Sequence, residues 1–262
     1  MSSPDSDSFV RAFARGLRVI EVMGQASGHC TIAQIAQASE LPRTVVRRLL
    51  FTLAELGFVK TDERSYWLTP KVLRLGLTYL YTLPFWRQSQ LVLEELGTRL
   101  GQSCAIAVLD EAEIVYVQRF HTKRILAMSP STGTRLPAYA VSMGRVLMAG
   151  LEESALEIRL GTFPPQRYTA RTITDIVRLR REILTVRKRG YCWVDGELDE
   201  SICGLAVPVR DTQGTVVAAL NVSLLSGEFN QEQAVATFLP LLKLAASRLK
   251  SGPNSHLGGL GP

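Results

Sequence analysis

Hydrophobic residues recur with helical spacing through residues 14–81, whereas short alternating segments rich in β-branched residues appear from residue 103 onward. The first pattern predicts a helix over residues 15–26. The positions that this helix would turn toward a core are Leu17, Ile20, Val22 and Met23. The change of period near residue 100 predicts two modules of different architecture, joined by a helix over residues 71–81.

The stretch that follows the first helix predicts two more helices, separated by a short turn. Thr31 and Gln34 have the spacing of a capping box, which opens a short helix. Pro42 suits the first turn of the next helix because its missing N–H costs nothing there, and Gly57 ends that helix. The apolar face of this third helix would carry Val46, Leu49, Leu50, Leu53 and Leu56. Its opposite face would carry Thr44, Arg47, Arg48, Phe51 and Glu55.

Two helices joined by a short turn, the second one basic near its start, are typical of a helix-turn-helix unit that binds the DNA major groove. The apolar segments 58–60 and 66–68 flank a polar tip and predict a hairpin wing. The residues expected to contact bases or phosphates from the third helix are Arg43, Thr44, Arg47 and Arg48. Those expected to contact phosphates or the minor groove from the wing are Lys60 and Arg64. Because such a unit can also bind other proteins, a sensor that does not bind DNA stays open.

The remainder of the chain predicts helices alternating with strands in a mixed, mostly antiparallel α+β arrangement. Helices are expected at 84–100, 142–150, 152–160, 175–189 and 231–250. Strands are expected at 103–109, 114–119, 125–128, 191–194, 205–210 and 215–223. The short segment 211–214 predicts a tight hairpin turn between the last two strands.

Composition supports a globular protein with a basic first module. The 262 residues are 46% hydrophobic and 21% charged, with a net charge of +6. Residues 1–83 hold ten basic and seven acidic side chains (net +3), and residues 84–262 hold twenty and seventeen (net +3), so the basic excess per residue is about double in the first segment. This favours a partner that is a polyanion. No long apolar run and no leader-like start occur, which predicts a cytoplasmic protein without a membrane span.

The cysteine, histidine and serine residues form no recognisable metal-binding or catalytic motif. The four cysteines include no CxxC pair, and three histidines complete no metal-ligand spacing, so neither a metal nor a cofactor is expected. Residues 140–144 resemble the nucleophile pattern GxSxG only in part, since the first glycine is missing and no histidine has an evident route to Ser142. The sequence therefore predicts a protein that is not an enzyme, with a GAF-like enzyme as the alternative.

The residues from about 13 to 250 resemble an IclR-type transcriptional regulator. The resemblance is carried by ARGLRVIEVM, TIAQIAQASELPRTVVRRLLFTLAELGFV, YWLTPKVLRLG, LPAYAVSMGRVLMA and RGYCWVDGELDESICGLAVPVRD. It implies a winged helix-turn-helix domain (13–69) joined by a linker helix (70–83) to a GAF-like α/β effector-binding domain (84–250). The ends, 1–12 and 251–262, are expected to be a flexible arm and a disordered tail. Homodimers formed through the first domain, and further association to tetramers, are also implied.

The resemblance also implies where an effector would bind. The positions that match the family's effector cleft are Leu126, Met128, Tyr139, Ser142, Met143, Gly144, Val194, Asp195, Cys203, Gly204, Asn221 and Ser223. Some members have a polar residue where Val194 stands and cysteine where Gly204 stands, so this chain has room for a ligand bulkier than glyoxylate or pyruvate.

Several groups in this region suit a carboxylate or a phenol. The start of the helix near Ser142 offers unpaired backbone N–H groups to a carboxylate, and Asn221 with Ser223 can bond phenolic or carboxylate oxygens. Arg119, Arg124 and Arg135 are alternative carboxylate clamps, although solvated surface positions are the simpler expectation for them.

Together these features predict a regulator that binds a pseudo-palindromic operator in double-stranded DNA as a homodimer. The segment LPAYAVSMGRVLMA resembles the branch of the family that senses aromatic acids and their ring-cleavage products. The expected effector is therefore a small organic acid of this kind, and the expected targets are catabolic genes.

Overall fold

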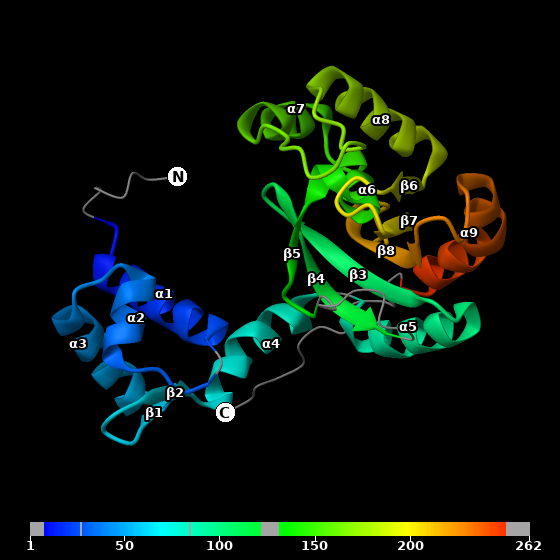
Figure 1. Ribbon diagram of the computed structural model, residues 1–262. Helices are drawn as coiled ribbons and strands as arrows, with labels where there is room; N and C mark the ends of the chain where they lie inside the picture. Colours follow the sequence, from blue (N-terminus) through cyan, green and yellow to red (C-terminus); the bar gives the residue numbers. More distant parts are fainter. Residues whose placement is uncertain (1–7, 27, 84, 122–130, 250–262) are drawn as a thin grey trace. The chain divides into compact units, whose positions relative to one another are not determined.

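The computed structural model describes residues 8–26, 28–83, 85–121 and 131–249. The chain divides into two compact units between Leu80 and Tyr81, inside the predicted linker helix. The fold is a helical unit with a small hairpin followed by a unit of mixed helix and sheet, which confirms the predicted fold class (Figure 1).

The N-terminal unit is a three-helix bundle with a two-stranded wing. Its elements are α1 (Arg11–Gln25), α2 (Ile32–Ser39), α3 (Arg43–Glu55), β1 (Val59–Thr61) and β2 (Tyr66–Leu68). The predicted capping box at Thr31 and Gln34 is present and fixes the start of α2. Glu40 adopts a left-handed conformation (φ 57°) after α2, so the chain turns sharply before Pro42 and α3. These local signals produce the helix-turn-helix geometry.

The core of this unit differs from the predicted one at two leucines. Val19, Val22 and Met23 form the buried stripe of α1, whereas Leu17 lies on another face and is 42% exposed. Leu56 is 53% exposed because α3 has already ended at Glu55. The rest of the buried cluster comes from α2, α3 and the wing and includes Ile35, Val46, Leu50, Leu53 and Val59.

A short 3-10 turn, η1 (Pro70–Val72), leads into α4 (Leu73–Thr82). The predicted helix over 71–81 is therefore present, and its first turn has the tighter winding. None of the helices in the described part of the chain has both the length and the apolar character that a membrane span needs.

The C-terminal unit is built on a six-stranded sheet in the order β5-β4-β3-β8-β7-β6. Its strands are β3 (Ser103–Asp110), β4 (Glu113–Phe120), β5 (Arg135–Pro137), β6 (Cys192–Asp195), β7 (Ile202–Arg210) and β8 (Val216–Leu225). Every pairing among these strands is antiparallel. The helices α5 (Trp86–Leu100) and α9 (Gln231–Arg248) cover one face. The other face carries η2 (Ala138–Ala140), α6 (Ser142–Ala149), α7 (Glu153–Thr162) and α8 (Ile176–Arg189) (Figure 1).

Small side chains let α6 lie directly on the sheet. The sheet residues beneath it include Ala105, Ala107, Ala206 and Ala219, all of which are buried. Every residue of α6 is buried, including Gly144, where a Cβ would overlap the backbone of Ala138. The start of α6 is thereby held against the middle of the sheet.

The predicted elements of this unit are largely present, with some differences. The strand β5 was not predicted, and β7 begins three residues earlier than expected, at Ile202. The predicted strand 125–128 lies outside the described residues, as do the tail 251–262 and residues 1–7 of the predicted arm. Residues 11 and 12 of that arm are already the first turn of α1.

Gly97 is required where α5 crosses the end of β4. A Cβ at this position would overlap the ring of Phe120. We expect Gly97→Ala to lower the free energy of unfolding by about 1–3 kcal/mol, because the ring or the helix must move. Gly161→Ala in α7, where nothing lies within 4 Å of the added Cβ, serves as the control and should be neutral or slightly stabilising. Urea unfolding measures both, and equal midpoints would contradict this packing.

Candidate functional site: a DNA-contact surface and an effector pocket

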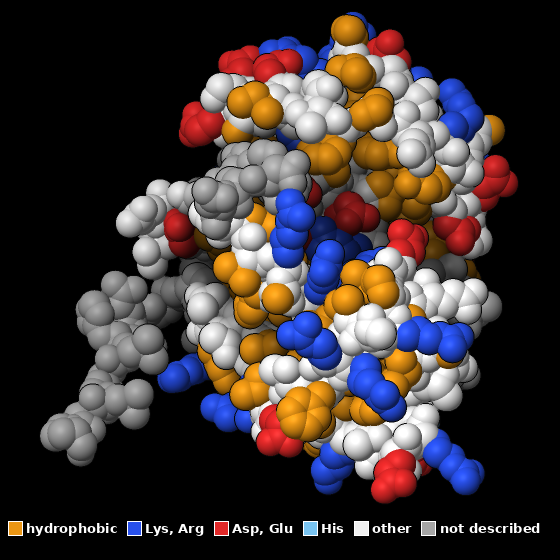
Figure 2. Space-filling model, turned by 90° about the vertical axis from the view of Figure 1, so that its left-hand side faces the viewer, with side chains coloured by type: hydrophobic (Ala, Val, Ile, Leu, Met, Phe, Trp, Pro, Cys, Tyr) orange, Lys and Arg blue, Asp and Glu red, His pale blue; other side chains and the backbone are white. Residues whose placement is uncertain are grey.

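The four α3 residues predicted to contact DNA all lie on the exposed face of that helix. Arg43, Thr44, Arg47 and Arg48 are exposed, while Val46 and its neighbours on the other face are buried. Together with α1 and the wing, this face borders a hollow of about 720 Å³ to which Arg15, Arg47, Arg48 and Tyr66 contribute. Figure 2 shows basic side chains interspersed with hydrophobic ones, so this face of the molecule is not one continuous basic patch.

The wing is a rigid hairpin with a mixed-charge tip. Lys60 and Arg64 are exposed, as predicted. Asp62 accepts hydrogen bonds from the backbone N–H groups of Arg64 (3.1 Å) and Ser65 (2.7 Å), which lower the pKa of its carboxyl group. At the base of the wing, the His29 ring stacks on Trp67 with centroids 4.3 Å apart. The wing therefore presents its basic side chains from a fixed backbone.

The C-terminal unit contains a pocket of about 320 Å³ between the sheet and the start of α6. The lining residues that the sequence singled out for the effector are Ser142, Met143, Val194, Cys203, Gly204, Asn221 and Ser223. The other described lining residues are Ser103, Tyr116, Arg119, His121, Leu136, Ala140, Val141, Glu197, Leu198, Asp199 and Ile202. Its size and largely apolar lining are those of a small-molecule site.

Three residues expected at the effector cleft lie away from this pocket. The Tyr139 hydroxyl bonds the backbone of Gln166 (2.7 and 2.9 Å). Gly144 faces Ala138 instead of the pocket. Asp195 accepts bonds from Arg171 (2.9 Å) and Ser226 (2.8 Å). Leu126 and Met128 lie outside the described residues, so the structure does not place them.

The floor of the pocket consists of two rows of residues that run across the sheet. One row pairs Val194 with Gly204, Gly204 with Ser223 and Ser223 with Ser103. In the neighbouring row each residue pairs with the next one across the sheet, in the order Cys192, Ala206, Asn221, Ala105 and Arg119. Since residues two apart on a strand share a face, both rows point to the same side of the sheet. A Cβ at Gly204 would lie 2.9 Å from the Ser142 hydroxyl, so glycine leaves room for that serine.

Arg119 points into the pocket because of a β-bulge. The register of β3 and β4 shifts between Ile106 and Ala107, so Tyr116 and Arg119, three residues apart, face the same side. The guanidinium lies 4.4 Å from the centre of the Tyr116 ring. Its Nε and Nη1 are buried and have no hydrogen-bond partner among the described residues.

The surface position expected for Arg119 is therefore wrong, since simple alternation misses the extra residue of the bulge. Arg135, by contrast, is an exposed side chain that pairs with Asp110 (2.8 Å) and Glu113 (2.6 Å). Arg124 lies outside the described residues.

His121 also borders the pocket, although the sequence did not indicate that any histidine would lie near Ser142. Burial and the nearby Arg119 charge lower the pKa of His121. No hydrogen bond joins Ser142 to His121 in the described part of the chain.

Asn221 is a buried polar residue of the floor. It is 4% exposed, and its Nδ2 donates a hydrogen bond to the Ser223 hydroxyl (3.1 Å). Its Oδ1 has no partner among the described residues. Because buried polar atoms are nearly always hydrogen-bonded, an unpaired acceptor in a pocket wall points to a group that a ligand supplies.

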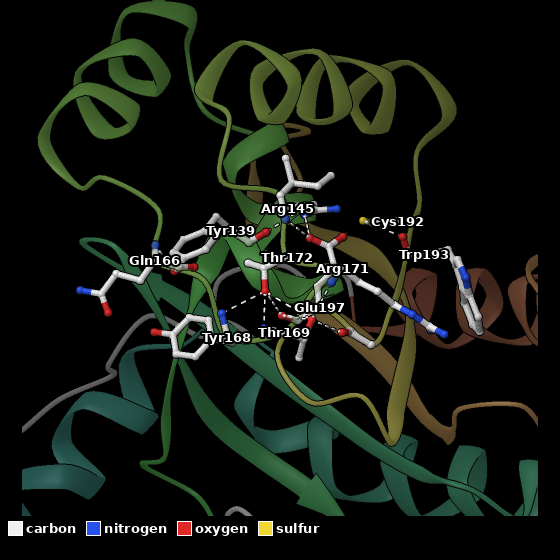
Figure 3. A network of polar contacts seen from close by, with 12 residues as sticks. Tyr139, Arg145, Gln166, Tyr168, Thr169, Arg171, Thr172, Cys192, Trp193 and Glu197 are labelled. Carbon is white, nitrogen blue, oxygen red and sulfur yellow. Dashed lines mark hydrogen bonds and ion pairs between the residues drawn. The ribbon is translucent and has the colours of Figure 1, made fainter.

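A buried ion pair that the sequence did not reveal holds one wall of the pocket. Arg145 of α6 and Glu197 are 3% and 9% exposed, and Arg145 Nη2 lies 2.6 Å from Glu197 Oε2 (Figure 3). Arg145 also donates to the carbonyl of Tyr139 (2.8 Å), and the backbone N–H of Ile173 donates to Glu197 (3.0 Å). The Thr172 hydroxyl donates to the Glu197 carbonyl (2.6 Å). The network fixes Glu197 and the pocket residues that follow it relative to α6.

The cysteines offer no reactive thiol or metal ligand. All four are free and buried. Burial raises the pKa of the Cys203 thiol in the pocket wall to about 12 and that of Cys192 to about 11. No group of three metal-binding side chains gathers anywhere in residues 8–249 as far as these are described.

A winged helix-turn-helix unit with an exposed basic helix, followed by an α/β unit with a pocket, defines a DNA-binding regulator with its own ligand domain. The model of the IclR helix-turn-helix domain matches residues 12–63, and that of the bacterial transcriptional regulator IclR C-terminal domain matches residues 77–251. This chain therefore belongs to the IclR family of bacterial transcriptional regulators.

Two relatives and two solved structures support this assignment. The Pca regulon regulatory protein of Pseudomonas putida is 41% identical over 92% of this chain and 82% of its own length. The p-hydroxybenzoate hydroxylase transcriptional activator of Acinetobacter baylyi is 32% identical over 94% and 93%. A transcriptional regulator from Rhodococcus sp. RHA1 is 40% identical with a TM-score of 0.81 over 92% of this chain and 97% of that one. The inducer-binding domain of a PobR double mutant from Acinetobacter, in complex with 3-hydroxybenzoic acid, is 31% identical with a TM-score of 0.59 over 63% and 97%.

The buried ion pair predicts a large cost for removing one partner. We expect Arg145→Met to lower the free energy of unfolding by about 3–5 kcal/mol, because Glu197 would stay buried without its counter-charge. Adding Glu197→Gln should recover part of the loss. Arg180→Met removes an exposed arginine that pairs with Glu153 and Glu157 and should leave the urea midpoint nearly unchanged. Similar midpoint shifts for Arg145→Met and Arg180→Met would refute the role of the network.

Proposed function

We propose that this regulator senses a small aromatic acid in the pocket of its C-terminal unit and controls catabolic genes. The observation that carries the proposal is the pocket of about 320 Å³, whose lining combines apolar side chains with Arg119, two of whose nitrogen atoms are buried without a hydrogen-bond partner among the described residues. Relatives named for the Pca regulon and for p-hydroxybenzoate hydroxylase, and a neighbour solved with 3-hydroxybenzoic acid, support an effector of this class.

Two groups in the pocket suit a carboxylate. The start of α6 at Ser142 directs backbone N–H groups and the positive end of a helix dipole toward the pocket. Arg119 offers a full charge with two buried, unpaired N–H groups, and its fork matches a carboxylate. We assign the carboxylate to Arg119, and Tyr116, Leu136 and Met143 supply apolar surface for the ring.

DNA contact is assigned to the exposed face of α3 and to the wing. The α3 residues Arg43, Thr44, Arg47 and Arg48 would contact bases and phosphates in the major groove. Lys60 and Arg64 would hold the wing to phosphates or the adjacent minor groove. An occupied pocket can change operator affinity only if it favours another spacing of two such units through the linker helix.

Arg47 gives the sharpest test of the recognition helix. We expect Arg47→Ala to weaken binding to an operator selected from random DNA pools by about 1–3 kcal/mol, because a guanidinium contact to a base or phosphate is lost. Lys243→Ala removes an exposed lysine of α9 and should leave affinity unchanged. Fluorescence anisotropy over a salt series measures both, since binding through phosphates must weaken as salt rises. If Arg47→Ala bound the operator as tightly as the wild type does, the assignment of α3 as the recognition helix would be wrong.

A homodimer is proposed from apolar surface on the N-terminal unit. Phe13 and Leu17 lie one turn apart on α1 and are exposed, and Leu73 and Leu77 have the same spacing on α4. Exposed apolar side chains that recur along one helix face mark an interaction surface. Two copies would present two recognition helices to a pseudo-palindromic operator. Tetramers would require further contacts.

Substitutions on this surface test the dimer. We expect Phe13→Glu and Leu73→Glu to shift the chain toward monomers, because each places a charge at the buried contact. Ile158→Glu alters a comparably exposed residue of α7 and should leave the association state unchanged. Sedimentation velocity at several protein concentrations measures the shift. An unchanged distribution for the first two variants would exclude this surface.

Two alternative functions remain distinguishable from the proposed one. Ser142 and His121 share the pocket, so a GAF-like enzyme would show turnover that Ser142→Ala abolishes; we propose that no such activity exists, since no hydrogen bond joins the two side chains in the described residues. A sensor independent of DNA would show no retention on DNA that depends on salt. We place the protein in the cytoplasm, on nucleoid DNA.

A further inference from the structure

We propose that Asn221 selects effectors that carry a hydroxyl group at the end of the ring opposite their carboxylate. The inference rests on the proposed function, because it takes the pocket to be the effector site. It adds a residue that decides which aromatic acids are bound. Three observations carry it: the register of the sheet, the unpaired atoms at two positions of one row, and the small residues that flank Asn221.

The register places Arg119 and Asn221 on opposite sides of the same residue. Ala105 of β3 pairs with Arg119 of β4 on one side and with Asn221 of β8 on the other. The two backbones are therefore two strand spacings apart, roughly 10 Å. Both side chains line the pocket, so one ligand can contact both of them.

The unpaired atoms at the two positions have opposite hydrogen-bonding character. Arg119 offers only donors, which an anionic oxygen satisfies. Asn221 donates through Nδ2 to Ser223, which leaves Oδ1 as an acceptor that needs a donor from the ligand. A ring with a carboxylate at one end and a hydroxyl at the other satisfies both sets, whereas benzoate would bury the Asn221 oxygen without a partner.

The residues beside Asn221 in the sheet are small. Ala105 and Ala206 flank Asn221 in its row, and Gly204 stands in the next row beside Ser223. A pocket that hydrogen-bonds a ligand hydroxyl discriminates strongly against an analogue that lacks the hydroxyl. This discrimination is larger than the one an apolar pocket achieves between ligands that differ only in size. Asn221 therefore acts on specificity.

Calorimetric titration of the full-length protein with matched compounds tests this inference. The compounds are 4-hydroxybenzoate, 3-hydroxybenzoate, benzoate, 4-methoxybenzoate, which has the oxygen without its proton, and 4-hydroxybenzyl alcohol, which lacks the carboxylate. We expect 4-hydroxybenzoate to bind about 10-fold or more tightly than 3-hydroxybenzoate, benzoate and 4-methoxybenzoate. Asn221→Leu, which is similar in size but has no acceptor, should abolish this preference while benzoate binding persists.

Arginine variants separate the two ends of the ligand. Arg119→Met should weaken every acid and leave the alcohol unaffected, whereas Arg135→Met, at an exposed arginine, should change neither. Asn221→Ala gives a second variant in case Asn221→Leu does not fold, which circular dichroism would reveal. If the wild type binds 4-hydroxybenzoate no more tightly than benzoate or 3-hydroxybenzoate, or if the preference is retained in both Asn221 variants, the role of Asn221 is overturned. Binding of none of the acids would instead overturn the proposed function.

Discussion

The extra residue in β4 is the constraint on which the chemistry of the pocket depends. An antiparallel pair without the bulge would turn Arg119 to the face opposite Tyr116, because successive side chains alternate. With the bulge, the guanidinium stacks on that ring and shares a face with Asn221. A single shift of register therefore supplies the only full positive charge that the described lining residues bring to the pocket.

Arg145 and Arg119 of the C-terminal unit differ in how their charges are balanced. Arg145 is balanced by Glu197 and by the carbonyl of Tyr139, so its charge fixes α6 against the loop that forms a pocket wall. Arg119 has no comparable partner among the described residues. Since breaking a buried ion pair is costly, the contact with Glu197 lets Arg145 define a pocket wall, whereas Arg119 keeps two nitrogen atoms without partners among the described residues.

The N-terminal unit differs from the C-terminal unit because the side chains proposed to contact DNA are exposed on its surface. Local signals define it: a capping box at Thr31, a left-handed turn at Glu40 and a proline before α3. These place Arg47 and Arg48 outward while Val46 and Leu50 pack inward.

The sequence by itself determined the two-unit plan, most of the elements and the outward face of α3, because helix periodicity, caps and turns depend on residues a few positions apart. It also placed Ser142, Gly204 and Asn221 near one another through resemblance to a family. Only the tertiary structure decided that Arg119 points inward, that Tyr139 and Asp195 face elsewhere, and that Glu197 pairs with Arg145 across 52 positions. Those outcomes depend on strand register and on contacts between distant segments, which no local pattern encodes.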